Sequence, residues 1–168
     1  MSKSIKYKNN TYLDSSSITH NKEILSKHLN NINSSCFCIL NNGNLKEERQ
    51  ATFETTEITG DAFTIENNNI KIQNAKRIRI SANISLQFQQ SGQSFIMIKI
   101  VKNNDIILRN YAFSNNMALY FYDSCNISSF ELDVNKNDII KMYISSELNG
   151  MIHNDEWGKS YISVEKIK

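Results

Sequence analysis

Chemically versatile side chains gather in one polar stretch near the carboxyl end of the chain. His153, Asn154, Asp155 and Glu156 are consecutive, and Trp157 follows them. A histidine beside carboxylates could transfer protons or hold a metal ion. Consecutive residues in a loop share no defined face, however, so this spacing alone does not assemble a site.

Elsewhere the sequence has no motif that would complete a catalytic or metal centre. The other two histidines, His20 and His28, lie in a separate region, and a nucleophile elbow, a phosphate-binding loop and an HExxH motif are all lacking. Asp14, Ser15 and His20 are the residue types of a Ser-His-Asp catalytic triad, but nothing in the sequence brings them together. Enzymes that cleave glycans usually carry paired carboxylates in a long groove, and this chain is short for that. We therefore expect a protein that is not an enzyme and has no cofactor or metal ion.

Recognition of a ligand suits the polar stretch better than catalysis. Trp157 offers an apolar plane for a sugar ring, and His153, Asn154 and Asp155 offer hydrogen-bonding groups. Trp157 could equally be a packing anchor that pins the loop. We predict a ligand-binding loop formed by His153, Asn154, Asp155 and Trp157.

The three cysteines do not form a metal set. Cys36 and Cys38 are separated by one residue and Cys125 is remote, whereas structural zinc sites use paired spacings. We expect free, partly buried thiols.

Charge and hydropathy exclude several classes of partner. The chain has 168 residues, with 19 Lys and Arg against 17 Asp and Glu, and its basic residues are spread singly along the predicted strands. A nucleic-acid surface would need clustered charge. No apolar stretch is long enough for a membrane span, and the first residues lack the apolar core of a signal peptide. We expect neither nucleic-acid binding nor membrane insertion.

The clearest element is the stretch from Ile70 to Phe88, in which apolar residues occupy even positions and polar residues odd ones. This alternation predicts half-buried strands. We predict a short strand at Ile70–Ile72, a bend at Gln73–Lys76 and a long strand at Arg77–Phe88. The polar odd positions indicate a solvent-facing sheet.

Two later segments differ because they have apolar residues at both odd and even positions. Phe95–Val101 reads FIMIKIV and Met117–Tyr122 reads MALYFY. A strand that is apolar on both faces must be covered on both. We expect these segments to mark a second sheet, which another subunit would cover.

The remaining segments are also short strands that end in Asn- and Gly-rich turns, and only Thr19–Asn33 has helical spacing. The pattern predicts an all-β sandwich with a short N-terminal helical or extended segment. We expect residues 1–50 to form that segment and its linker, and residues 51–168 to form the folded domain.

The order of the strands resembles the C1q and tumour-necrosis-factor-like (TNF-like) jelly roll. The resemblance rests on four runs in sequence: NNNIKIQNAKRIRISANISLQF, SFIMIKIVKNNDII, SSFELDVNKNDIIKMYISSE and SYISVEKI. The third run has Asn137-Asp138 where the family has Gly-Asp, and Asn also accepts that turn geometry. The resemblance implies a jelly-roll β-sandwich that forms a homotrimer, with one sheet of each subunit facing the threefold axis.

The candidates for that trimer interface are large residues at strand positions that alternate with the core residues or lie alongside them. They could instead fill loops and sandwich edges of a monomer. The candidates are Phe95, Met97, Tyr120, Tyr122, Tyr143 and Tyr161.

The leading run KYKNNTYLDSSSITHNKEILSKHL resembles N-terminal segments of tail proteins from phages of Gram-positive bacteria. That resemblance implies a virion protein whose partners are other tail proteins and a saccharide or protein on the host cell surface. The alternative is a structural trimerisation cap of a fibre or surface appendage that recognises nothing.

Overall fold

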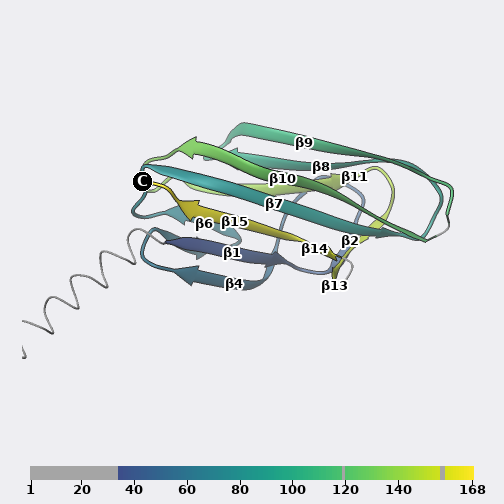
Figure 1. Ribbon diagram of the computed structural model, residues 1–168, viewed down its shortest axis with the longest axis horizontal. Coiled ribbons are helices and arrows are strands. Elements are labelled where there is room, and N and C mark those ends of the chain that lie inside the picture. Colours follow the sequence, from purple (N-terminus) through teal and green to yellow (C-terminus); the bar gives the residue numbers. More distant parts are fainter. Residues whose placement is uncertain (1–33, 119, 156–157) are drawn as a thin grey trace, which may run out of the picture.

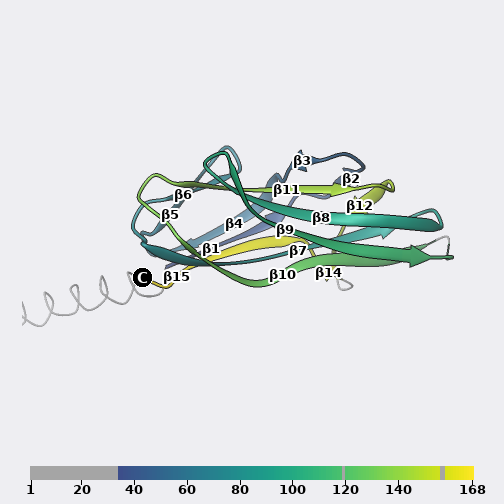
Figure 2. The same cartoon turned by 90° about the horizontal axis from the view of Figure 1, so that it is seen from above.

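The chain folds into two antiparallel sheets packed face to face (Figures 1 and 2). The computed structural model describes residues 34–118, 120–155 and 158–168. The helix predicted at Thr19–Asn33 lies outside these residues. Among the described residues, no helix has the length and apolarity needed to cross a membrane.

The first sheet, which we call the β7 sheet, is built around the long strand β7 (Arg77–Phe88). One edge of β7 pairs with β10, and the other pairs with β15 and β12. Beyond these strands lie β2, β1 and β4. The bounds of the other members are β1 (Ser35–Leu40), β2 (Gly43–Leu45), β4 (Phe53–Thr59), β10 (Phe121–Asp133), β12 (Gly150–Ile152) and β15 (Tyr161–Lys166).

The second sheet, the β8 sheet, has the order β5, β6, β11, β8 and β9, and β3 also pairs with β11. Its strands are β3 (Arg49–Gln50), β5 (Phe63–Glu66), β6 (Asn69–Ile72), β8 (Gly92–Lys102), β9 (Asp105–Asn116) and β11 (Ile139–Ser146). A small separate ladder joins β13 (Asn154–Asp155) to β14 (Gly158–Lys159).

The alternating stretch has the predicted form. The long strand occupies Arg77–Phe88, the short strand before it is Asn69–Ile72, and a bend separates them. The even-numbered side chains of β7 are buried and face β8 and β11 across the sandwich. The core therefore lies between the sheets and is filled largely by isoleucine, which suits a pleated surface. Fully buried members include Ile78, Ile80, Ile84, Leu86, Phe88, Ile96, Ile98, Ile100, Ile140 and Ile144.

The expected contrast between two kinds of sheet is wrong. Strand β10, which begins within the second doubly apolar segment, pairs along the length of β7, from Phe121 with Phe88 to Asp133 with Arg77. Before Phe121 the segment is not a covered strand: Met117 is 93% exposed and Tyr120 is 69% exposed. The alternation of apolar and polar residues cannot show which sheet a strand joins, because it indicates which faces of the strand are buried and not which strand pairs with it.

The first doubly apolar segment does lie in the other sheet, but the chain itself covers much of its outer face. Met97 is 9% exposed and Val101 is 6% exposed on that face. Between them, the Lys99 ammonium forms an ion pair with Glu48 and lies 4.7 Å from the centre of the Tyr143 ring. These contacts provide part of the cover that we assigned to another subunit.

The sandwich also begins before Ala51, where we expected the domain to start. Strand β1 lies between β4 and β15, and Cys36, Cys38 and Leu40 are fully buried. The cysteines are free and buried. The hydrogen bond with Cys36 and burial raise the pKa of the Cys38 thiol, and burial raises the pKa of Cys125. Both thiols are therefore held protonated, which is the unreactive form.

Asparagine takes the place of glycine in several turns. Asn103 has a φ of 53° in the β8–β9 hairpin, and Asn137 has a φ of 72° in the β10–β11 turn. Asparagine tolerates this left-handed region better than other residues with a side chain. The Asn137-Asp138 departure from the Gly-Asp pattern is therefore accommodated by the backbone.

Candidate functional site

The predicted recognition loop is fixed to the outer face of the β7 sheet. Strand β12 pairs with the end of β7, and the backbone N–H of His153 donates to the Ser85 carbonyl at 3.1 Å. The buried Ser160 hydroxyl accepts from the Ser85 N–H at 3.0 Å. The loop therefore has a defined position on the sheet, which its sequence alone did not provide.

His153 lies at the centre of a polar cluster formed with Gln87, Tyr122 and Asp155. Its Nδ1 lies 2.7 Å from Asp155 Oδ2, and its Nε2 lies 2.9 Å from Gln87 Oε1. The Gln87 amide donates to the Tyr122 hydroxyl at 3.0 Å, and the Tyr122 ring meets the imidazole edge-on at 5.4 Å between centroids. The loop and two long strands thus share one network.

The polar side chains that contact the His153 imidazole nitrogens are an amide and a carboxylate. Both imidazole nitrogens face acceptor oxygens, so a doubly protonated ring can donate to both, whereas a neutral ring requires the Gln87 amide to turn over. Among the described residues, no serine hydroxyl or cysteine thiol is hydrogen-bonded to the imidazole. In the same residues no group of three or more His, Cys, Asp and Glu is placed to hold a metal ion.

Asn154 positions the loop and has little capacity left for a ligand. Its Nδ2 donates to the Leu40 carbonyl at 2.6 Å and to Asn42 Oδ1 at 2.9 Å. Its Oδ1 accepts from the Ser160 N–H at 2.8 Å. The amide therefore ties the loop to the end of β1. Trp157, the proposed stacking residue, lies outside the described residues.

A polar pocket of about 260 Å³ opens beside this loop on the outer face of β7 and β10. Asn83 donates to the Lys159 carbonyl at 2.6 Å, which fixes the loop at the rim of the pocket. Sequence reasoning missed this pocket, because polar odd positions on β7 indicated only a solvated face. Its lining residues are Asn83, Ser85, Tyr122, Asp123, Ser124 and Gly158.

The predicted interface residues lie on two opposite faces of the sandwich. Tyr122 and Tyr161 lie on the outer face of the β7 sheet, where the Tyr161 ring packs 5.3 Å from Phe37. Phe95, Met97 and Tyr143 are on the outer face of the β8 sheet. The sixth residue, Tyr120, lies in the connection between β9 and β10.

The β8 sheet carries the larger exposed apolar surface. Phe95 is 45% exposed, and Tyr111 and Phe113 on β9 are each 55% exposed. Phe95 lies opposite Phe113 with 5.0 Å between ring centroids, and Met97 lies opposite Tyr111. We call these four residues the β8–β9 aromatic patch. Phe95, Met97 and Tyr111 also line a groove of about 630 Å³. The sequence prediction omitted Tyr111 and Phe113, although their spacing of two residues already indicated a shared face.

Comparison with known proteins places the fold. No protein-family model and no curated protein sequence matches this chain. A crystal structure of murine APRIL at pH 8.0 aligns over 80% of this chain and 98% of its own, with a TM-score of 0.56 and 11% identity. The Eiger TNF structure from S. frugiperda aligns over 81% of this chain and 93% of its own, with a TM-score of 0.60 and 10% identity. The chain thus has the two-sheet architecture of a TNF-like jelly roll.

Proposed function

We propose that this chain forms a homotrimeric, non-catalytic attachment head of a phage tail, which binds a saccharide or protein on the surface of a host bacterium. The proposal rests chiefly on the exposed β8–β9 aromatic patch. Monomeric proteins seldom expose such clustered aromatic side chains, which commonly mark interaction surfaces. The TNF-like fold and the phage-like leading segment are consistent with it.

Two apolar surfaces of the sandwich are available for contacts in a cyclic trimer. In a threefold ring, each subunit contacts its neighbour through two different surfaces. The β8–β9 aromatic patch supplies one exposed surface, and the Phe37–Tyr161 pair lies on the opposite face of the sandwich. We propose that the first surface of one subunit covers the second surface of the next.

The ends of the domain are suited to attachment at a distance. The Lys166 N–H bonds to the Ser34 carbonyl, so the first described residue lies near the C-terminus. Strands β13 and β14 lie away from that terminus, beyond the other end of β1 and β15 (Figure 1). If residues 1–33 join the head to other tail proteins, β13 and β14 are distant from the point of attachment at Ser34. Three copies of a weak site then add avidity.

A structural cap remains the second candidate. The Asn154 amide is engaged by the chain's own groups, and Gln87 binds both His153 and Tyr122. A loop whose polar groups are satisfied internally could serve only to close the end of the sandwich.

Binding to host envelopes separates the two candidates. We expect the fluorescently labelled protein to adsorb to whole cells or wall extracts of its host, and Trp157→Ala to weaken adsorption by about tenfold or more, since stacking on a sugar supplies roughly 1–3 kcal/mol. Ile58→Ala removes an exposed apolar side chain from β4, outside the loop, and is the control that should leave adsorption unchanged. Absence of wild-type adsorption to host cells and extracts would favour the structural cap.

A further inference from the structure

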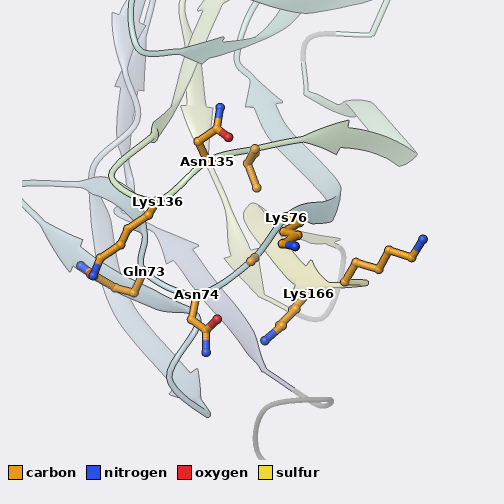
Figure 3. A pocket seen from close by; sticks show the side chains of 9 residues that line it. Gln73, Asn74, Lys76, Asn135, Lys136 and Lys166 are labelled. Atoms are coloured by element: carbon orange, nitrogen blue, oxygen red, sulfur yellow. The ribbon is translucent and has the colours of Figure 1, made fainter.

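A pocket lined by lysines lies at the end of the sandwich where β15 ends (Figure 3). It has a volume of about 410 Å³, within the range of small-molecule sites. Three segments meet there: the bend between β6 and β7, the turn between β10 and β11, and the end of β15. The lining residues are Gln73, Asn74, Ala75, Lys76, Val134, Asn135, Lys136, Lys166 and Lys168.

The charge of this lining is one-sided. Four of the nine lining residues are lysines and none is acidic, although the whole chain has a net charge of only +2. Lys76, Lys136 and Lys168 form no ion pair with any described residue. A terminal carboxylate at Lys168 would remove one unit of charge and leave the lining positive. Like charges around one pocket repel one another, and a bound anion would offset that repulsion.

The nearby carboxylates are directed to other partners. Asp133 and Glu131 pair with Arg77 at 3.7 and 3.3 Å. Asp138 accepts from Asn103 and lies 3.9 Å from Lys102. Asp61 accepts from the Asn74 amide at the rim of the pocket, at 3.2 Å. Among the described residues, these acids therefore form no ion pair with Lys76, Lys136 or Lys168.

The backbone around the pocket is held in place before any ligand binds. The Lys76 N–H donates to the Lys168 carbonyl at 2.7 Å, and the Val134 N–H donates to the Lys76 carbonyl at 3.0 Å. The Asn137 N–H donates to the Ile72 carbonyl at 2.8 Å. These bonds join the three segments, so a ligand would have to order only the lysine side chains.

The floor and rim indicate the kind of anion. Ala75 and Val134 are buried and apolar, while the side chains of Gln73, Asn74 and Asn135 carry amide groups. Lysine ammonium groups bind phosphate as point charges, and a phosphate monoester carries nearly two negative charges. We propose that this pocket binds the phosphate group of a sugar phosphate or polyol phosphate, with the carbon skeleton lying against Ala75 and Val134. This site is separate from the proposed recognition loop.

Calorimetric titration tests the proposal with glucose 6-phosphate as the probe and glucose as its neutral match. We expect binding of glucose 6-phosphate in the millimolar range or tighter, and at least a tenfold weakening in the Lys76→Gln/Lys136→Gln variant, about 1.4 kcal/mol. Lys46→Gln/Lys159→Gln removes the same charge from exposed positions outside the pocket and should change affinity by less than about twofold. Equal weakening by both variants, or no binding by the wild type at about 10 mM, would overturn the proposal.

Two further measurements define the source of the phosphate and guard against misfolding. Inorganic phosphate and poly(glycerol phosphate) replace the probe in parallel titrations, and binding that is strongest for the polymer assigns the site to a wall polymer. The single variant Lys136→Gln alters an exposed turn residue and should retain the wild-type melting temperature. If it retains full affinity for all three probes, the site assignment is wrong.

Discussion

At the scale of single residues, Asp138 joins two turns that are distant in sequence. Its Oδ2 accepts from the Asn135 N–H at 2.9 Å, and its Oδ1 accepts from the Asn103 amide at 2.9 Å. Burial, the largest single effect, raises the pKa of this carboxyl. The hydrogen bonds from Asn103 and Asn135 and the charge of Lys102 together outweigh burial and lower the pKa below its usual value. The ionised form is therefore the stabilising one.

Asp138→Asn should lower the free energy of unfolding by roughly 1–2 kcal/mol at pH 7, because charge-assisted hydrogen bonds are lost from a side chain that is 12% exposed. A depressed pKa contributes stability above about pH 4, the unfolded value, and this contribution disappears as the pH falls through the lower native pKa. Urea unfolding at pH 7 and at pH 2.5–4 measures both effects.

Asp133→Asn is the matched control, because its side chain is 86% exposed and its pairing with Arg77 lies in solvent. It should change stability by less than about 0.5 kcal/mol. An Asp138→Asn difference that persists unchanged at the lowest pH would show that the carboxylate charge is not its source.

Residue types alone predict only part of the candidate site. The contact between His153 and Asp155 is local, and both were among the predicted ligand-binding residues. Gln87 and Tyr122 are separated from His153 by many residues and reach it only through strand pairing. Asn154 was predicted as a ligand residue by type, yet its hydrogen bonds are directed to Leu40, Asn42 and Ser160.

At the scale of elements, the recognition loop depends on close approach between β14 and β7. A Cβ on Gly158 would collide with Ser85 Oγ and lie 2.9 Å from Ser85 Cβ. Gly158→Ala should therefore displace the β13–β14 ladder and destabilise the protein by roughly 1–3 kcal/mol in urea unfolding. Lys159→Ala next to it should have little effect, because Lys159 is exposed.

Combination with Ser85→Gly distinguishes this collision from other causes. If the Ser85 side chain is the obstacle, the double variant should be more stable than the sum of the two single effects predicts, by roughly 0.5 kcal/mol or more. Simple additivity of the two substitutions would mean that Gly158 is required for another reason.

Strands were predicted correctly where a local pattern of apolar and polar residues specified them. Strand Arg77–Phe88 has the predicted bounds because strict alternation with one buried face specifies both the strand and its register. The apolar run Cys36–Leu40 was assigned to the N-terminal segment because a polar loop follows it. Only the pairing of β1 with β15, from the far end of the chain, shows that this strand lies within the sheet. The partner of β10 is likewise a long-range choice.

At the scale of the whole molecule, the β8–β9 aromatic patch should hold the proposed trimer together. The Phe95→Ser/Phe113→Ser variant should dissociate at concentrations where the wild type remains assembled, since burial of each aromatic side chain contributes roughly 1–3 kcal/mol. Ile58→Ser on β4 replaces another exposed apolar residue, 42% exposed, outside the patch and should leave assembly unchanged. Sedimentation equilibrium compares the variants. A trimer that survives the double substitution would place the interface elsewhere.

The molecular mass of the wild-type protein in solution tests the central claim most directly. Light scattering behind size exclusion, repeated over a wide range of concentrations, should give three times the 19.4 kDa chain mass. A mass equal to that of a single chain throughout the range would contradict the trimeric attachment head and leave the exposed aromatic residues without their proposed role.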